Sequence, residues 1–494
     1  MVSQPGLKRA YARRPKNWGW AADGLPPPAP FPRSALLADS VVRSIAPGGK
    51  ITEVEATLVT RGALGTLRDE HAVCRGDWPL EHGPMELLQK PPPIEWCHMS
   101  DSAQNSRHLE VVQAVRGTFH HFDLARELRT HGYLRRIYSD FPWQRLKREG
   151  VAKDKVSTFP WIHTPHLLLA SRGLVPAALN RELNWFGALC FDAWVTKTLP
   201  RCDAFISASA AGVSAGQKAQ RMGAKYFCDR GSSHIRYQDR ILREEFDLWG
   251  VEHGFIVDPR FIAREETAYE KADAITVPSE FARRSFLEMG VPAEKLHRIP
   301  YGVRLDRFRR TSEPPAGRFE VLFVGAGTLQ KGVPWLLQAF ARVRHPHKRL
   351  RVVGGMKPEL LQLLPRLPRE NVEFLGRLPQ SQLPDIMSSS HVMVMPSVQE
   401  GLALVQGQAM ACGCPLISTL HTGGEDLFTN GVEGFLVPIR SPEAIAEKLQ
   451  QLADDPALQQ RMSEAALRRV RQIGGWKEYG DAWIRLLHSA AAFA

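Results

Sequence analysis

The sequence predicts an α/β protein built on parallel, doubly wound sheets. Short apolar runs alternate with helix-period segments through most of residues 318–455. A strand followed by Pro-Ser and a helix occurs in both halves, in VPSEF from Val277 and in MPSVQ from Met395. Strands that alternate with helices favour a parallel sheet, because each crossover helix covers a sheet face. We therefore expect two related layered regions.

The composition is typical of a globular protein with two sizeable cores. The chain has 494 residues, of which 44% are hydrophobic and 23% are charged. Its formal net charge of +12 indicates attraction to an anionic membrane surface, a nucleoside diphosphate or nucleic acid. The sequence has no zinc-finger, helix-turn-helix or aromatic-basic RNA motif, so we expect no nucleic-acid partner.

Cysteine and histidine spacing predicts neither disulfides nor a metal site. The seven cysteines form no regular framework, which indicates a reduced, cytoplasmic setting. His120, His121, His163 and His166 lack the spacing of known metal motifs, so we expect no metal and no cofactor. Apolar runs are too short to span a membrane, and we expect membrane contact to be peripheral, at the inner face.

The first part of the chain carries little regular pattern. PPPAPFP and KPPPIEW resist regular structure, and only ITEVEATLVT alternates as a strand does. We expect residues 1–105 to form a Pro-rich, irregular extension. From Leu109 the chain predicts a strand, a turn at Arg116-Gly117, and a helix with Phe122 and Leu128 on one side.

A second strand–turn–helix unit begins at Phe319. The strand covers Phe319–Val324, a turn follows through Gly325 and Gly327, and the next helix has five apolar residues on one face. Lys331 lies in that turn, where its charge could reach a diphosphate approached closely by glycine backbone. The alternative for Lys331 is an ordinary solvated lysine.

The segment PSVQEGLALVQGQAMACGC, residues 396–414, predicts a ligand site at the carboxyl end of a strand. Gly401 allows an anion to approach the free N–H groups at a helix start. Glu400 repels phosphate, so we expect it to accept hydrogen bonds from hydroxyls beside the anion, which indicates a sugar nucleotide. The alternative for Glu400 is a first-turn acid favoured by the helix dipole.

The stretch EGLALVQGQAMACGCPLI resembles the donor-binding signature of retaining GT-B glycosyltransferases of family four, the group 1 glycosyltransferases. This resemblance covers about four fifths of the chain. It implies two Rossmann-like domains facing a cleft, with Glu400 beside the donor sugar and Lys331 neutralising the leaving diphosphate. Gln408 replaces the family's second glutamate, which holds the ribose hydroxyls, and an uncharged amide implies weaker donor binding.

The resemblance also implies roles for other residues. His234 would lie near the reaction face of the sugar, although most histidines have no such role. Gly117 would face the donor phosphates across the cleft, and Gly423, Gly424 and Asp426 resemble a glycine-rich loop that a plain turn explains almost as well. Two family features differ here, since Ala326 replaces a common arginine and Ala403 a second glycine. The full set expected at the donor is Gly117, Gly327, Gly401, Leu402, Ala403, Leu404 and Gln408, with Glu400, Lys331 and His234 as catalytic residues.

We therefore expect a retaining glycosyltransferase that moves a sugar from a nucleoside diphosphate to an acceptor hydroxyl, in polysaccharide or glycolipid synthesis. The acceptor domain would cover residues 106–315 and the donor domain residues 316–470. Residues 471–494 would form a terminal helix that packs back on the first domain. Two alternatives remain open, a sugar-nucleotide epimerase of similar architecture and a non-catalytic nucleotide-sugar-binding protein.

Overall fold

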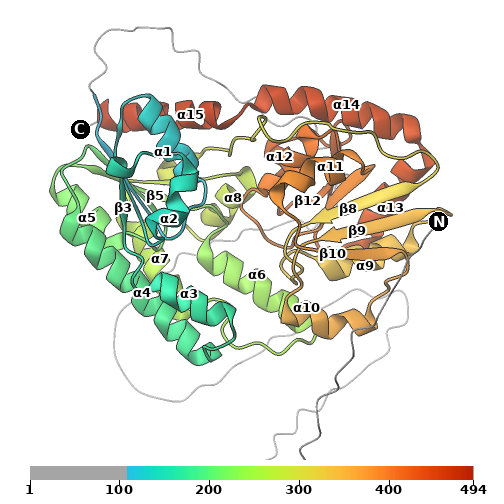
Figure 1. Cartoon of the computed structure of the whole chain (residues 1–494), viewed down its shortest axis with the longest axis horizontal. Coiled ribbons are helices and arrows are strands. Elements are labelled where there is room, and N and C mark those ends of the chain that lie inside the picture. The colour runs from blue at the N-terminus through green and yellow to red at the C-terminus, as the bar shows by residue number, and fades with distance from the viewer. Residues whose placement is uncertain (1–107, 493–494) are drawn as a thin grey trace, which may run out of the picture. The chain divides into compact units, whose positions relative to one another are not determined.

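The computed structural model describes residues 108–492, which carry two parallel sheets (Figure 1). The predicted extension, including ITEVEATLVT, lies outside the described residues. The first sheet has the order β3-β2-β1-β4-β5-β6-β7, with every neighbouring pair parallel. Its strands are β1 Val111–Val115, β2 Leu134–Ser139, β3 Val156–Thr158, β4 Ala204–Ala208, β5 Lys225–Asp229, β6 Ala274–Val277 and β7 Leu296–Arg298.

The second sheet has the order β10-β9-β8-β11-β12-β13 and is also parallel throughout. The two sheets confirm the predicted doubly wound α/β class, and the predicted strand Phe319–Val324 matches β8. Its strands are β8 Phe319–Val324, β9 Lys348–Val353, β10 Val372–Gly376, β11 Val392–Met395, β12 Leu416–Thr419 and β13 Gly434–Val437.

Helices connect the parallel strands. In the region of the first sheet they are α1 His121–Thr130, α2 Trp143–Leu146, α3 His163–Ser171, α4 Ala177–Thr198, α5 Val213–Arg221, α6 Ile235–Leu248, α7 Pro259–Lys271 and α8 Glu280–Glu288. The later helices are α9 Val333–Arg342, α10 Pro358–Leu363, α11 Leu383–Ser388, α12 Leu404–Ala411, α13 Pro442–Asp454, α14 Pro456–Ile473 and α15 Trp476–Ala492. Within the described residues, none of these helices is both long enough and apolar enough to cross a bilayer.

Each sheet reverses its strand order once, and this reversal positions the site. In the second sheet β8 lies between β9 and β11, so the chain winds away from β8 in both directions. Ligands of open α/β sheets bind beside such a reversal, at the carboxyl ends of the strands. The loops that leave β8 and β11 there carry Lys331 and Glu400.

The second sheet is packed as its apolar pattern predicts. Val333, Leu336, Leu337 and Phe340 of α9 are all buried against the sheet in one core cluster. The apolar stripe of α9 therefore fixes the helix that begins directly after Lys331.

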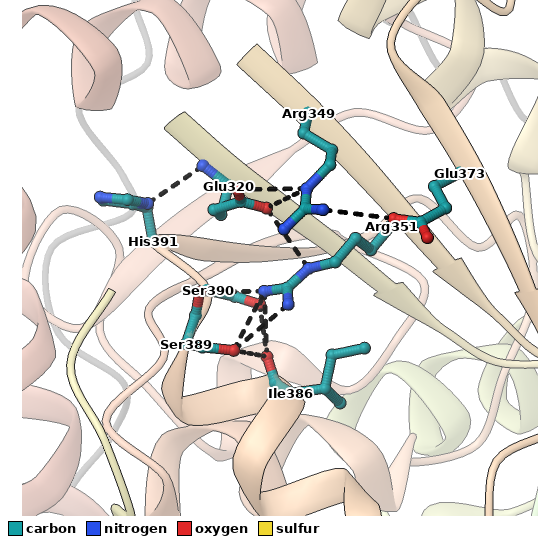
Figure 2. Close-up of polar contacts among 8 residues, drawn as sticks. All are labelled: Glu320, Arg349, Arg351, Glu373, Ile386, Ser389, Ser390 and His391. Carbon is teal, nitrogen blue, oxygen red and sulfur yellow. Dashed lines mark hydrogen bonds and ion pairs between the residues drawn. The ribbon is translucent and has the colours of Figure 1, made fainter. Parts of the chain in front are cut away.

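A buried ionic network lies near the start of β8, away from the carboxyl ends of the strands (Figure 2). Glu320 is fully buried and pairs with Arg349 at 2.9 Å and with Arg351 at 3.4 Å. Arg351 also donates to Ser390 Oγ at 2.8 Å, which joins β9 to the segment after α11. A buried carboxylate requires such partners, because an unpaired charge in the core is strongly destabilising.

The last helix, α15, packs against α1 of the first sheet region. Tyr133 Oη lies 3.1 Å from His488 Nε2 in α15, and Trp483 is fully buried in the cluster that contains Phe122. The chain therefore returns from the second sheet to complete the core beside the first.

Candidate active site

Lys331 and Glu400 form an ion pair at the point where the β8–α9 and β11–α12 loops meet. Lys331 Nζ donates to Glu400 Oε1, and the side chains are 23% and 12% exposed. The pair therefore places a cation and a carboxylate side by side, partly open to solvent, at the carboxyl edge of the second sheet.

Backbone contacts hold these two loops against each other. Gly332 has φ of +67°, and a Cβ at this position would lie 2.0 Å from Pro396 O, so only glycine fits. Val398 N donates to Gln330 O at 2.8 Å, and Gln330 Nε2 donates to Gln399 Oε1 at 2.9 Å. The relative positions of the lysine and the glutamate are thus set by main-chain contacts and by the hydrogen bond between the Gln330 and Gln399 side chains.

Gly401 touches the first sheet region backbone to backbone. It forms an isolated antiparallel bridge with Ser232, and a Cβ at position 401 would lie 2.1 Å from Gly231 O. Ser279 Oγ donates to Gly401 O at 2.6 Å, while Gln399 Nε2 donates to Ser232 Oγ at 2.8 Å. The segment around Gly231 therefore closes directly over the start of the predicted signature.

The contact between Gly401 and the Gly231 segment buries the residues whose amides were expected to bind an anion at the start of the helix. Leu402 and Ala403 are each only 6% exposed, and Ala403 N donates to Thr422 O at 3.2 Å. Helix α12 begins at Leu404, which is 40% exposed. The amide of Ala403 is therefore engaged by the protein itself in this conformation, and Leu404 is the accessible residue of the predicted Gly401–Leu404 stretch.

Leu404 and Gln408 line a cavity of about 530 Å³, within the range of small-ligand sites. The cavity also contains four arginines, from α1, the segment after α2 and the segment after β7, and its charge suits an anionic ligand. The lining residues are Asp123, Arg126, Arg148, Glu149, Gly150, Gly302, Val303, Arg304, Arg307, Gln380, Leu404, Gln408 and Trp476.

Gly117 and Gly327 both lie in tight loops, and their amides have protein partners. Gly117 has φ of +92° and donates to Asp140 Oδ1 at 2.7 Å. Gly327 N donates to Gly355 O at 3.0 Å, and a Cβ on Gly327 would lie 2.3 Å from Met356 Sδ. Gly117 is thus favoured by its positive φ and Gly327 by close packing, whether or not a phosphate approaches them.

His234 caps a helix. Its Nδ1 accepts from Arg236 N at 3.2 Å at the start of α6, and its own amide donates to Ser285 Oγ at 2.9 Å. The residue is 3% exposed, and its ring packs against Tyr269 and Phe286 at centroid distances of 4.9 and 5.0 Å. The structure therefore brings Lys331 and Glu400 together but gives His234 contacts typical of a capping residue.

We expect His234 to make stability depend on pH. Burial lowers the pKa of His234 to about 4, with Arg230 and Arg236 adding to the effect and Glu266 opposing it. The unfolded chain binds this proton below about pH 6.5, so stability falls as pH decreases towards 4, by about 2–3 kcal/mol. Asparagine also caps helices, so H234N should fold. It should lose the part of the pH-dependent change in unfolding free energy that His234 contributes.

Urea unfolding at pH 7 and pH 4.5 measures this prediction for both proteins. His391, whose pKa is likewise lowered to about 4 by burial, titrates in both, so the difference between them isolates His234. Equal losses of unfolding free energy in the wild type and in H234N would contradict the prediction.

Two polar residues that the sequence did not single out join the two sheet regions. Ser279 caps α8 by accepting from Ala282 N at 3.1 Å and also donates to Gly401 O. Gln399 is fully buried, accepts a hydrogen bond from Gln330 in the β8–α9 loop and donates one to Ser232 in the segment after β5. The repeated Pro-Ser pattern marks Ser279 as a helix cap, but nothing local in the sequence shows its second partner.

Asp426, marked by the family resemblance, also links the two regions. It accepts from Glu280 N at 2.9 Å and pairs with Arg298 at 2.6 Å. Burial raises the pKa of Asp426 to about 6, and Arg298 opposes that rise. In this conformation, therefore, Asp426 contacts the first sheet region.

Two family models match the chain in succession. The model described as "Glycosyl transferase 4-like domain" matches residues 41–302, more than half of the chain. The model described as "Glycosyl transferases group 1" matches residues 306–469. The second match contains Lys331, Glu400 and Gln408.

Curated relatives match the chain over part of their length. An alpha-D-kanosaminyltransferase of Streptomyces kanamyceticus is 30% identical over 230 residues, which are 43% of this chain and 59% of the relative. A D-inositol 3-phosphate glycosyltransferase of Streptomyces avermitilis is 36% identical over 204 residues, 37% of this chain and 44% of the relative. The chain thus matches about half the length of these relatives.

Solved structures share the two-sheet fold. A sucrose-phosphate synthase from Thermosynechococcus elongatus matches with a TM-score of 0.59 and 19% identity, over 78% of this chain and 100% of that chain. Anabaena HepE in complex with UDP and glucose matches with a TM-score of 0.57 and 17% identity, over 77% and 100%. Both likenesses concern the fold.

Proposed function

Because the chain belongs to the group 1 glycosyltransferases and has the GT-B fold, we propose that it transfers a sugar from a nucleoside diphosphate to an acceptor hydroxyl with retention of configuration. The observation that carries this proposal is the Lys331–Glu400 pair beside the strand reversal of the second sheet. The lysine would pair with the diphosphate, and the carboxylate would accept hydrogen bonds from the sugar hydroxyls.

Lys331 supplies electrostatic stabilisation. Negative charge grows on the diphosphate as the glycosidic bond breaks, and a lysine already held in place stabilises that charge more in the transition state than before it. Glu400, which pairs with Lys331 in the free protein, accepts hydrogen bonds from the donor sugar. The lysine then exchanges one anionic partner for another as the donor binds.

The remaining predicted residues have supporting roles in this proposal. Gln408 and Leu404 hold the nucleoside in the arginine-lined cavity, with the amide of Gln408 bonded to ribose. Gly401, Leu402, Ala403 and Gly327 shape the donor loops, and Gly117 shapes the facing loop. His234 orients the segment that carries Ser232. HepE has been solved with UDP-glucose, which makes UDP-sugars the first donors to test.

Calorimetry with UDP, GDP and their sugars tests donor binding, and product analysis with a panel of glycan and glycolipid acceptors tests transfer. We expect the protein to bind one class of nucleotide. We also expect sugar transfer to occur only when an acceptor is present. Sugar inversion without acceptor would identify an epimerase. Binding without turnover across the panel would identify a non-catalytic binding protein.

The acceptor side of the proposal includes peripheral contact with a membrane. Helices α3 and α4 lie side by side (Figure 1), and exposed apolar residues gather on them and on the loop between them, among them Leu168 at 51% and Leu174 at 65% exposure. Arg172 and Arg181 of the same segment are also exposed, and the chain carries a net charge of +12. Apolar anchors with basic neighbours suit an anionic bilayer surface, where a glycolipid acceptor would be found. The other exposed apolar residues here are Trp161, Leu167, Leu169, Leu179, Phe186 and Leu189.

Replacing Leu168 and Leu174 together by serine is expected to weaken vesicle binding at least about thirtyfold, because each leucine buried in lipid contributes roughly 1 kcal/mol or more. Co-sedimentation with phosphatidylcholine vesicles, alone and mixed with phosphatidylglycerol, measures this effect. Leu361→Ser is the control, since Leu361 is 52% exposed on α10. Equal binding of all three proteins to the mixed vesicles would contradict membrane contact through α3–α4. Binding of a partner protein in place of vesicles would identify the surface as a protein-binding site.

A further inference from the structure

His120, His121 and Asp229 form a buried cluster where the start of α1 meets the end of β5. The exposed fractions of the three residues are 8%, 2% and 5%. One ligand atom from each lies within 4.8 Å of the others, and this is the one such group of histidine, cysteine and acidic residues within residues 108–492. His120 Nε2 is 2.7 Å and His121 Nε2 is 3.3 Å from Asp229 Oδ2.

Hydrogen bonding accounts for His120 but not for His121. His120 and Asp229 form a normal hydrogen bond. Both ring nitrogens of His121 are buried without a hydrogen-bond partner, although Nε2 lies 3.3 Å from the carboxylate. Two polar atoms this close without hydrogen-bond geometry are typical of ligands that converge on a shared third atom. A buried imidazole with no partner is otherwise a costly defect, and native cores rarely keep one.

We propose that His120, His121 and Asp229 bind a divalent transition-metal ion of the zinc class. Two imidazole nitrogens and one carboxylate oxygen form a donor set that suits zinc or iron better than calcium or magnesium, which prefer oxygen ligands. Ligand atoms around a tetrahedral zinc ion are roughly 3.3 Å apart, because each is about 2.0–2.1 Å from the metal. The separation of 3.3 Å between His121 Nε2 and Asp229 Oδ2 equals that value, and His120 Nε2, at 2.7 Å, would exchange its hydrogen bond to Oδ2 for a bond to the ion.

The surroundings orient these ligands as metal sites require. Thr276 Oγ1 donates to Asp229 Oδ1 at 2.8 Å, which turns Oδ2 towards the two imidazoles. The ring of His120 packs against the tilted ring of Tyr301 at a centroid distance of 4.4 Å, so its rotation is restricted. Three protein ligands leave one position of a tetrahedral ion for water or another oxygen ligand.

The ion fixes one wall of the contact between the two sheet regions. A Cβ on Gly231 would lie 3.3 Å from His120 Cε1, and Gly231 is the residue that meets Gly401. An ion that joins α1 to β5 therefore fixes His120, against which the Gly231 segment packs. This role is structural and independent of the proposed sugar transfer.

Cobalt titration of the full chain, after chelator treatment and dialysis, tests the proposal. We expect the wild type to bind one equivalent of Co²⁺ with visible d–d absorption, and Zn²⁺ to displace it. H121Q and D229N should each weaken binding by more than the roughly 10–100-fold that outer-shell changes cost. H253Q is the matched control, because His253 also pairs with an aspartate, Asp247, at 3.0 Å but lies outside the cluster.

X-ray absorption of the zinc-loaded wild type gives a second measurement that needs no variant to fold. The expected shell contains two imidazoles, an oxygen ligand and no sulfur. The proposal is overturned if the wild type binds no Co²⁺, if H121Q and D229N bind as tightly as H253Q, or if the zinc shell contains sulfur from cysteine. A normal circular-dichroism spectrum of each variant establishes that lost binding reflects a lost ligand.

Discussion

Replacing Lys331 by alanine is expected to lower kcat about 10²–10³-fold, because a preorganised charge at the leaving diphosphate contributes roughly 3–4 kcal/mol to transition-state stabilisation. Binding of the donor should change less than kcat, since the charge on the diphosphate increases as the bond breaks. Initial rates at saturating donor and acceptor measure kcat, and calorimetry with the donor alone measures affinity.

The control for this experiment is Lys477→Ala. Lys477 also forms an ion pair, with Asp481 at 2.7 Å, but it lies on α15 and is 72% exposed. Its removal should leave kcat within a factor of about two, since exposed pairs contribute little. If K331A and K477A have the same kcat, Lys331 is not the stabilising cation.

Replacing Gly332 by alanine is expected to destabilise the protein by about 2–5 kcal/mol. The residue has φ of +67°, where a Cβ costs roughly 1–2 kcal/mol. The Cβ would also lie 2.0 Å from Pro396 O, a backbone atom that moves only with its loop, and such overpacking costs about 1–3 kcal/mol more. Urea unfolding monitored by circular dichroism measures the loss.

Gly250→Ala separates backbone strain from this collision. Gly250 has φ of +60° but no atom within 4 Å of its added Cβ, so only the backbone cost remains. We expect G332A to lose the activity that depends on the Lys331–Glu400 pair, and G250A to keep it. Equal destabilisation of the two variants would show that the contact with Pro396 costs nothing.

Local pattern was sufficient to predict the second sheet and to place Lys331 and Glu400 after its strands, but not to predict that the two side chains pair. Apolar period and glycine turns predict β8 and α9, and Lys331 and Glu400 follow adjacent parallel strands, whose carboxyl ends share one edge. The closure by Ser232 and Gly401 joins residues far apart in the chain, so no local pattern indicates it.

Two other features could not be predicted from the sequence, for physical reasons. The α3–α4 pair connects β3 to β4 and has leucines on exposed surface, and its apolar residues therefore do not mark a core-facing stripe. Spacing of histidines along the chain also predicts no metal site, but β5 brings Asp229 to His120 and His121 from more than one hundred residues away.

The position of α15 has a consequence for the order of folding during synthesis. Trp483 is fully buried beside Phe227 of β5, with ring centroids 6.1 Å apart, and α15 also covers α1. Domains usually fold as the ribosome releases them, amino-terminal part first. Here the first sheet emerges early but keeps an uncovered apolar face until the last helix of the chain leaves the exit tunnel. The first sheet region therefore completes its core only after α15 has been released.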